Sequence, residues 1–355
     1  MNQRGGAERV FAQIARAYPD APVYTSIADS AVTGDLIAPE RVRTSILQRL
    51  PGHNRYFRAL APFYPQVFEA FDLSAYDLVV SSTSAWAKGV RTRPDAIHVC
   101  YIHTVTRFLF AYDAYVGGIA GRSVIAGAAR PLVKRLAEWD LRAAQRPTAY
   151  IANSRNVADR VRRYYEREAD VLPGPVELDR WRVGSGGGDY FIVVSRLLPY
   201  KRIDVAIEAC ARAGVPLLVV GGGPSERALR ERARGTSTTL LGFLPDADVA
   251  RLVGEARALL FPGEEDYGLV PLEAAAAGTP TIAFAAGGAL ETVIAGQTGE
   301  FFQEQNPEAL ASALRGFDRK RYPAERLRTH AEQYAPERFR ERFRAIVDRV
   351  IAERA

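Results

Sequence analysis

Two glutamates, Glu265 and Glu273, enclose seven residues in the stretch EEDYGLVPLE. Paired carboxylates are the catalytic acid and base of most glycoside hydrolases. If a helix begins near Gly268, however, Glu265 lies in the preceding loop and Glu273 more than one turn inside the helix. The two carboxylates then need not face one bond. They could hold hydroxyl groups of a donor molecule, with Glu273 on a ribose, or they could only stabilise the start of the helix.

Two cations, Arg196 and Lys201, lie in the stretch FIVVSRLLPYKRID. Arg196 stands at the end of a predicted buried strand and Lys201 at the start of the next helix, so both can reach the loop edge of a parallel sheet. A guanidinium fork and an ammonium point charge together suit a diphosphate. The alternative is that both are ordinary surface cations beside a turn.

A glycine-rich turn follows the next strand, in VVGGGPSERALR. A helix capped by Ser225 would present free backbone N–H groups to an anion. The stretch lacks the G-x-G-x-x-G spacing and the acidic residue expected about twenty positions later, which disfavours a nicotinamide-dependent dehydrogenase.

The elements that must position these residues alternate between strands and helices. Short apolar runs that end in small polar residues predict strands buried on both faces, and helical periodicity follows most of them. This order predicts a doubly wound α/β fold. The glycine-rich stretch GSGGGDY, residues 184–190, is interpreted as a linker or turn. The predicted strands are DLVVSSTS, AIHVCYIHT and PTAYIANS in the first half, and YFIVVSR, PLLVVGGG, TTLLGF, ALLFPG and TPTIAFA in the second.

Length and composition fit a two-domain protein, because 355 residues exceed what one hydrophobic core usually supports. No apolar run approaches the roughly 20 residues that cross a bilayer, and the N-terminus has no signal-peptide pattern. These features predict a cytoplasmic protein. The only cysteines, Cys100 and Cys210, lie in apolar surroundings, which favours buried thiols over a disulfide or a metal site.

The net charge of +6 is concentrated in one region. Residues 121–167 contain eleven basic residues against four acidic ones, a net +7. Such a face could lie on anionic lipid, but a solvated helix surface is the simpler interpretation. Nucleic-acid binding is disfavoured because the region contains no recognisable motif.

Arg196, Lys201, Glu265 and Glu273, in this order and spacing, resemble the signature of retaining GT-B glycosyltransferases of family four. The resemblance covers nearly the whole chain, and it looks strongest towards bacterial enzymes that transfer mannose from GDP-mannose in building surface polysaccharides. It implies two Rossmann-like doubly wound domains facing across a cleft. Its further motifs are RGGAERV, YDLVVSS, HVCYIHTVTRF, YIANSRNVADR and GEEDYGLVPLEAAAAGTPTIAFAAGGALETV.

The resemblance also implies domain bounds and partners. We expect an acceptor-side domain over residues 1–180, a nucleotide-sugar domain over 181–330 and a C-terminal helix over 331–355 that packs back on the first domain. The partners would be a nucleotide sugar, with GDP-mannose favoured, and a lipid-linked or oligosaccharide acceptor. The protein could then contact the inner face of an anionic membrane peripherally.

Residue roles follow from the resemblance by position. Arg196 and Lys201 would neutralise the departing diphosphate, and Glu265 would contact the donor sugar. His103, which follows a strand, would contact the sugar near the bond that breaks. The acceptor would attack the face that the diphosphate leaves, with the leaving phosphate helping to accept the proton. The remaining donor-binding residues would be Gly5, Gly6, Gly242, Phe243, Tyr267, Gly268, Leu269 and Glu273.

No cofactor or metal is expected. Asp246 and Asp248 spell the D-x-D pattern that binds manganese in the other large glycosyltransferase fold, but here they open a helix, where Asp at the N-cap and in the first turn is the simpler explanation.

The start of the chain departs from the family pattern. Family members have an apolar strand before the RGGAE turn, and this sequence begins after it, so we expect that Met1 is not the natural start or that the chain was trimmed. Two alternatives to a transferase stay open: a GT-B epimerase or phosphorylase acting on a sugar nucleotide or sugar phosphate, and a non-catalytic partner subunit.

Overall fold

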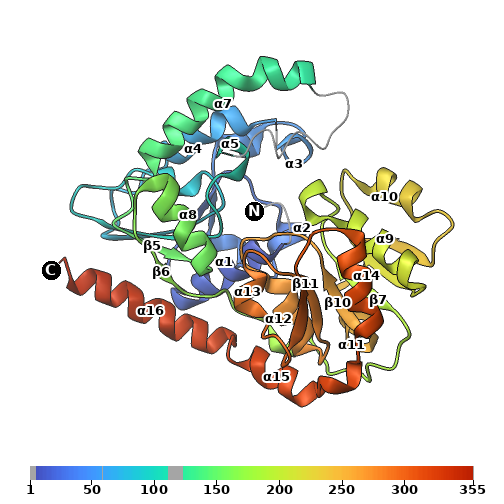
Figure 1. Ribbon diagram of the computed structural model, residues 1–355. Coiled ribbons are helices and arrows are strands. Elements are labelled where there is room, and N and C mark those ends of the chain that lie inside the picture. The colour runs from blue at the N-terminus through green and yellow to red at the C-terminus, as the bar shows by residue number, and fades with distance from the viewer. Residues whose placement is uncertain (1–4, 58, 111–122, 355) are drawn as a thin grey trace. The chain divides into compact units, whose positions relative to one another are not determined.

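The computed structural model describes residues 5–57, 59–110 and 123–354. The chain forms two compact units, the first containing Met1–Gly174 and Glu337–Ala355 and the second containing Pro175–Pro336. Each unit is built on a parallel sheet with helices around it (Figure 1). Within the described residues, no helix is both long and apolar enough to cross a membrane.

The first unit contains a four-stranded parallel sheet in the order β3-β4-β5-β6. Three of its strands were predicted from the sequence, and their bounds are Leu78–Thr83 for β3, Ile97–Ile102 for β4 and Ala149–Ala152 for β5. The fourth, β6, contains only Asp170–Val171. A second parallel sheet pairs β1, Val23–Thr25, with β2, Val42–Thr44, and the sequence patterns did not predict either.

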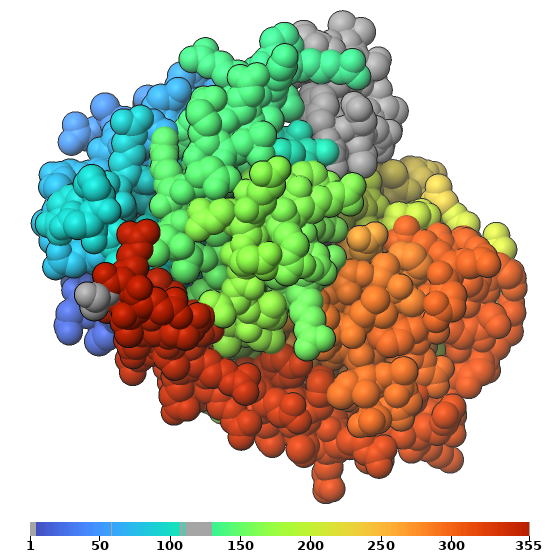
Figure 2. All heavy atoms as spheres, turned by 60° about the vertical axis from the view of Figure 1, so that its left-hand side comes forward, coloured from blue at the N-terminus to red at the C-terminus, as the bar shows by residue number. Residues whose placement is uncertain are grey.

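Alternate side chains of β4 explain why helices cover both faces of this sheet. Val99 and Tyr101 pack in one core cluster with helix α1, Gly6–Ala17, and helix α16, Pro336–Ala352. Cys100 and Ile102 pack on the opposite face against helix α8, Arg155–Tyr165. Helix α16 buries Phe339, Phe343, Val347 and Val350, whereas Ile351 is 37% exposed. Figure 2 shows α16 in red on the surface of the first unit.

The shorter elements of the first unit connect these layers. The longest of its remaining helices is α7, Ser123–Ala143. The others are α2 (Ser30–Thr33), η1 (Pro39–Arg41), η2 (Ile46–Arg49), α3 (His53–Tyr56), η3 (Ala61–Phe63), α4 (Tyr64–Glu69), η4 (Ala87–Gly89) and α5 (Arg107–Phe110).

The second unit contains a six-stranded parallel sheet in the order β12-β11-β10-β7-β8-β9. The order reverses beside β7, which is the position where doubly wound sheets bind ligands. All five strands predicted in this half are present. The bounds are Phe191–Val194 (β7), Leu217–Val220 (β8), Thr238–Gly242 (β9), Ala258–Phe261 (β10), Thr281–Phe284 (β11) and Gly299–Phe302 (β12).

Helices cover both faces of the second sheet (Figure 1). Helices α9, α10 and α14 pack side by side, and α12 packs against α15. Their bounds are Ile203–Ala213 (α9), Glu226–Ala233 (α10), Asp246–Glu255 (α11), Leu269–Ala276 (α12), Ala289–Thr292 (α13), Pro307–Gly316 (α14) and Ala324–Glu332 (α15), with short turns η5 (Leu178–Arg180), η6 (Pro199–Lys201) and η7 (Arg319–Arg321).

The glycine-rich stretch 184–190 is part of the second unit and does not link the units. Gly186 N donates to Gly254 O at 3.1 Å and Gly188 N to Glu255 O at 2.9 Å, which ties the stretch to the end of α11. A Cβ at Gly184 would lie 2.2 Å from the Gly254 backbone, so the glycine permits this close approach. The chain passes between units at 174/175 and again at 336/337, rather than at the expected 180/181 and 330/331.

Candidate active site

Most of the predicted site residues lie at the carboxyl ends of strands in the second unit. Arg196 follows β7, Gly242 ends β9 and Glu265 follows β10. Because all strands of the sheet are parallel, these ends lie along one edge, where the loops of doubly wound sheets bind ligands. Nine of the twelve predicted site residues belong to this unit, and His103, Gly5 and Gly6 belong to the first.

Lys201 and Glu265 form an ion pair between the β7–α9 and β10–α12 loops. The Lys201 side chain is 12% exposed and the Glu265 side chain 20%. Lys201 Nζ also lies 5.2 Å from the centre of the Tyr200 ring, which adds a cation–π contact. Two residues selected from separate motifs are therefore in direct contact in the structure.

Arg196 differs from Lys201 because its side chain has no partner among the described residues. The residue is exposed, and only its backbone oxygen is engaged, accepting from Leu198 N at 2.8 Å. A guanidinium without an ion pair, at the carboxyl end of a central strand, is available to bind an anion.

Helix α12 begins directly after the Glu265 loop. Its N-cap is Gly268, whose φ of 98° is in the region that favours glycine. Tyr267 is buried before it, and Leu269 is the first helical residue. The first N–H groups of a helix have no intrahelical partner, so this start can meet phosphate or sugar oxygens. Glu273 lies in the second turn and is half-buried.

Two glycines that the sequence interpretation did not assign hold this loop. Gly288 N donates to Glu265 O at 2.8 Å. A Cβ at Gly288 would lie 2.1 Å from Tyr267 O, and one at Gly287 would lie 2.3 Å from Glu265 O. The only sequence signal was the pair of glycines after the strand TIAFA, which does not reveal its packing partner.

The glycines 221–223 pack closely against the loop that carries Arg196. A Cβ at Gly221 would lie 1.9 Å from Ser195 O, and one at Gly223 would lie 2.6 Å from Leu197 O. Ser225 is the N-cap of α10, as predicted, but its side chain makes no capping hydrogen bond, and its backbone N donates to Leu197 O. These glycines therefore shape the Arg196 loop through close packing.

Gly242 and Phe243 lie at the end of β9. Gly242 has a φ of 71°, and its oxygen accepts from Gly221 N at 2.8 Å. The Phe243 side chain is 84% exposed, an unusual position for a large aromatic group. The chain therefore presents both the backbone and an aromatic ring at this edge of the sheet.

Asp246 and Asp248 lie in the first turn of α11, and Pro245, not Asp246, is the N-cap. Asp246 pairs with Arg180 at 2.8 Å. In the part of the chain that the structure describes, no three His, Cys, Asp or Glu side chains come together as a metal-binding group would.

In the first unit, His103 lies directly after β4. Its Nε2 is 2.8 Å from Ser82 Oγ, its backbone oxygen accepts from Asn153 Nδ2 at 3.1 Å, and its ring packs edge-on against Tyr101. Burial lowers the pKa of His103 to about 4, so the imidazole is neutral near pH 7.

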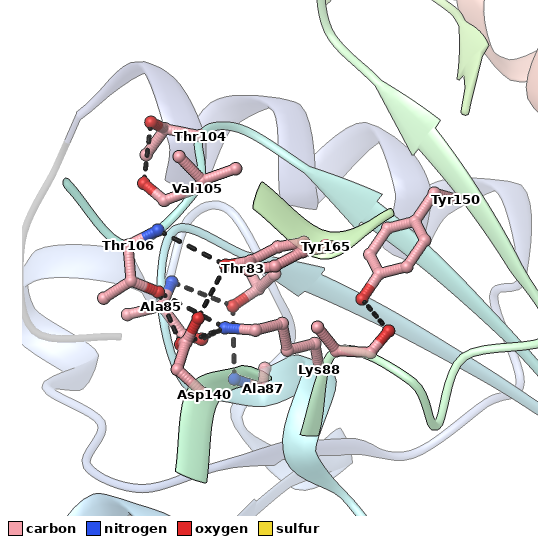
Figure 3. Close-up of polar contacts among 11 residues, drawn as sticks. Thr83, Ala85, Ala87, Lys88, Thr104, Val105, Thr106, Asp140, Tyr150 and Tyr165 are labelled. Atoms are coloured by element: carbon pink, nitrogen blue, oxygen red, sulfur yellow. Dashed lines mark hydrogen bonds and ion pairs between the residues drawn. The ribbon is translucent and has the colours of Figure 1, made fainter. Parts of the chain in front are cut away.

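A buried ion pair anchors the chain just beyond His103 (Figure 3). Lys88 Nζ contacts Asp140 Oδ1 at 2.5 Å, and both side chains are almost fully buried. Thr106 Oγ1 donates to Asp140 Oδ1 and Tyr165 OH to Asp140 Oδ2, each at 2.7 Å. The carboxylate thus has three partners, and it fixes Thr106 three residues after His103. No sequence pattern indicated this cluster.

Gly5 and Gly6 stand at the start of α1, with Gly5 as the N-cap. Gly5 N donates to Glu8 Oε2 at 3.1 Å, so an anion at this position would compete with the Glu8 carboxylate. Arg4, the first residue of the RGGAERV motif, lies outside the described residues.

Two parallel-sheet α/β units, with cations and carboxylates at the loop edge of the second, define the GT-B fold class. The solved structure of Anabaena HepE in complex with UDP and glucose shares this fold, with a TM-score of 0.72, 19% identity, and coverage of 98% of this chain and 97% of HepE. Residues 4–180 match the model described as Glycosyltransferase Family 4, and residues 176–338 match Glycosyl transferases group 1. The chain belongs to the glycosyltransferases that combine these two domains.

Curated relatives cover part of the chain. It is 34% identical over 203 residues to D-inositol 3-phosphate glycosyltransferase of Streptomyces avermitilis, covering 47% of this chain and 43% of the relative. It is 30% identical over 170 residues to O-antigen chain mannosyltransferase C of Escherichia coli, covering 43% and 44%. The chain spans about half the length of the curated relatives it matches.

Proposed function

We propose that the protein is a retaining, metal-independent glycosyltransferase that moves a hexose from a nucleotide diphosphate sugar to a lipid-linked or oligosaccharide acceptor. The observation that carries this proposal is the arrangement of Arg196, Lys201 and Glu265 at the loop edge of the second sheet, beside the start of α12. The match to both glycosyltransferase family models supports it.

The two cations would act on the leaving diphosphate. Negative charge accumulates on the phosphate as the glycosidic bond breaks, and fixed cations stabilise that charge more in the transition state than in the ground state. Arg196 is available for this role without breaking an ion pair, whereas Lys201 must exchange Glu265 for phosphate oxygens. Once released, the Glu265 carboxylate can accept hydrogen bonds from hydroxyls of the transferred sugar.

The remaining groups would hold the donor. The first N–H groups of α12 would meet phosphate or sugar oxygens, and Glu273 would accept from the ribose hydroxyls. Neutral His103 could exchange hydrogen bonds with the sugar without adding a further positive charge to those of Arg196 and Lys201. Retention follows if the acceptor attacks the face that the phosphate leaves. An NMR assignment of the product anomer would test this step, and an inverted anomer would refute it.

We favour mannose from GDP-mannose as the donor, because the sequence motifs resemble mannosyltransferases and the Escherichia coli relative carries that name. The test is a thermal-shift measurement with GDP, UDP and ADP on the wild-type chain, Lys201→Ala and Lys320→Ala. Lys320 is an exposed lysine of the same unit in η7 and serves as the control.

Stabilisation by GDP that is lost in Lys201→Ala and kept in Lys320→Ala is the expected result. A response to UDP or ADP alone would refute the GDP assignment. No response to any nucleotide, or an equal response in Lys201→Ala, would refute the proposed site.

We further propose that α7 contributes to contact with an anionic membrane surface on the cytoplasmic side. Lys134, Arg135 and Arg142 are exposed on this helix, and Leu132 and Leu141 are exposed large apolar side chains beside them. Cationic side chains near anionic lipid each contribute about 1 kcal/mol. Charge reversal at Lys134 and Arg135 should therefore weaken sedimentation with anionic liposomes, and equal binding to neutral and anionic liposomes would contradict the idea.

A further inference from the structure

Arg202 adopts a strained backbone conformation directly beside Lys201. Its φ of 50° and ψ of 39° are left-handed, and Glu166 is the only other described non-glycine residue with a positive φ. This region costs an ordinary side chain roughly 1–2 kcal/mol. Arg202 N nevertheless donates to Pro199 O and Arg202 O accepts from Val205 N, each at 3.1 Å, so the turn into α9 depends on this conformation.

The Arg202 side chain reaches a residue that is distant in sequence. Arg202 Nη1 donates to Gln305 Oε1 at 3.0 Å, and Arg202 Nε donates to Asp204 Oδ1 at 3.3 Å. Gln305 lies between β12 and α14, and its Nε2 donates to Pro262 O at 2.9 Å. Gln305 therefore uses both ends of its amide, one toward the Lys201 loop and one toward the Glu265 loop.

A second contact closes this connection into a ring. Gly263, next to Pro262, packs so closely on the Lys201 loop that a Cβ there would lie 2.8 Å from Tyr200 O and 2.9 Å from Lys201 Cα. The ring runs from Lys201 through Arg202 and Gln305 to Pro262 and Gly263, and back to Lys201. Glu265, the ion-pair partner of Lys201, follows two residues later.

The Lys201–Glu265 ion pair is a direct contact between the two side chains and does not include Arg202 or Gln305. By itself, this pair does not hold its two loops firmly together. The Lys201 and Glu265 side chains are 12% and 20% exposed, so solvent reaches both, and a diphosphate would compete with Glu265 for the Lys201 ammonium. The Arg202–Gln305–Pro262 hydrogen bonds involve no group that the donor displaces. They can hold the two loops at a fixed separation while Lys201 changes partner.

We propose that Arg202 and Gln305 are positioning residues that hold Lys201 in place for the diphosphate of the donor. This inference rests on the proposed function. The strain at Arg202 is consistent with it, because strained residues persist where surrounding contacts determine their conformation, and such residues cluster at functional sites.

The test is isothermal titration of the full chain with GDP and with UDP, using wild type, Lys201→Ala, Arg202→Ala, Gln305→Ala and the double variant Lys201→Ala/Arg202→Ala. Loss of either hydrogen bond should weaken the affinity for the nucleotide that binds by about three- to tenfold. In the Lys201→Ala background, Arg202→Ala should cause no further loss, because its effect passes through Lys201. The control is Arg212→Ala, which removes an exposed pair between α9 and Glu308 of α14 and should bind like wild type.

Two further variants separate positioning from folding. Arg202→Gly removes the side chain and also relieves the strain, so it should melt at or above the temperature of Arg202→Ala and still bind weakly. Gln305→Glu keeps the acceptor for Arg202 but loses the donor to Pro262, so it should bind as weakly as Gln305→Ala. Wild-type affinity in either variant would overturn the inference.

The outcomes also separate this inference from the proposed function. If Lys201→Ala weakens binding but the Arg202→Ala effect is absent, or persists undiminished in the double variant, the inference fails and the diphosphate site stands. If the wild type binds neither nucleotide, or Lys201→Ala binds like wild type, the proposed function fails and the inference fails with it.

Discussion

Gly263→Ala tests whether the packing of two loops sets the position of Lys201. A new Cβ would meet backbone atoms of Tyr200 and Lys201 at 2.8–3.0 Å, whereas ordinary contacts begin at 3.4 Å, so the loops must part by about 0.5 Å. Backbone atoms cannot rotate away as a side chain can. Inserting a methyl group into such a contact costs about 1–3 kcal/mol.

The expected result combines a modest loss of stability with a clear loss of binding. For a unit of this size, each kcal/mol lowers the melting temperature by about 2–4 °C, so Gly263→Ala should melt about 2–12 °C below wild type. Because displacement of a binding group by a fraction of an ångström weakens its interactions steeply, affinity for GDP should fall about tenfold. Differential scanning fluorimetry and isothermal titration measure the two effects separately.

Gly316→Ala is the matched control in the same unit. Gly316 is the last residue of α14, and a Cβ there meets nothing within 4 Å. Alanine is also the better helix former, so this variant should melt at or slightly above the wild-type temperature and bind normally. If Gly263→Ala melts and binds like Gly316→Ala, the close packing does not position Lys201 and the reasoning is wrong.

Three further predictions concern pH, metal and the buried ion pair. Burial lowers the pKa of His98 to about 3 and that of His103 to about 4, whereas an unfolded histidine titrates near 6.5. Below about pH 6.5 the unfolded chain therefore binds protons that the folded chain does not bind, and the folded state loses stability as the pH falls. His98 alone should reduce the free energy of unfolding by about 2 kcal/mol between pH 7 and pH 5, and equal urea midpoints at both pH values in the wild type would contradict this. Sugar transfer should survive EDTA, and activity lost with EDTA and restored by manganese would show a metal requirement. Lys88→Met should cost about 3–5 kcal/mol in urea denaturation because it leaves Asp140 charged and buried, and a loss under 1 kcal/mol would show that its hydroxyl partners suffice.

The strands that carry the site were predictable because they are buried on both faces. Runs such as FIVV and ALLF stand out as continuous apolar segments, and the polar residue after each one marks the loop edge of the sheet. The prediction of a doubly wound fold rested on these runs, and the structure confirms that fold. Strands β1 and β2 have only three residues each and no continuous apolar run, so their pattern could not be separated from that of a loop.

The contacts that hold the site together were not predictable, because they join residues far apart in the chain. Gln305 stands in a polar stretch, QEQN, that predicts only a loop. Gly287 and Gly288 were visible as glycines, but the backbone that each approaches was not. Sequence patterns report burial and local conformation, whereas pairing across a sheet depends on tertiary packing.

The structure also separates two kinds of polar group that the sequence displays alike. Lys88 and Lys201 are both lysines near the end of a strand or turn, and each contacts one carboxylate. Asp140 has Thr106 and Tyr165 as further hydrogen-bond donors, and both Asp140 and Lys88 are shielded from solvent, so a dissolved anion does not reach this pair. The Lys201–Glu265 pair is partly exposed at the loop edge of a sheet and can be opened by a competing anion. Both lysines have an ion pair, so the presence of a pair does not separate them. A lysine that can exchange its carboxylate for another anion can take part in binding, whereas one that cannot holds the fold.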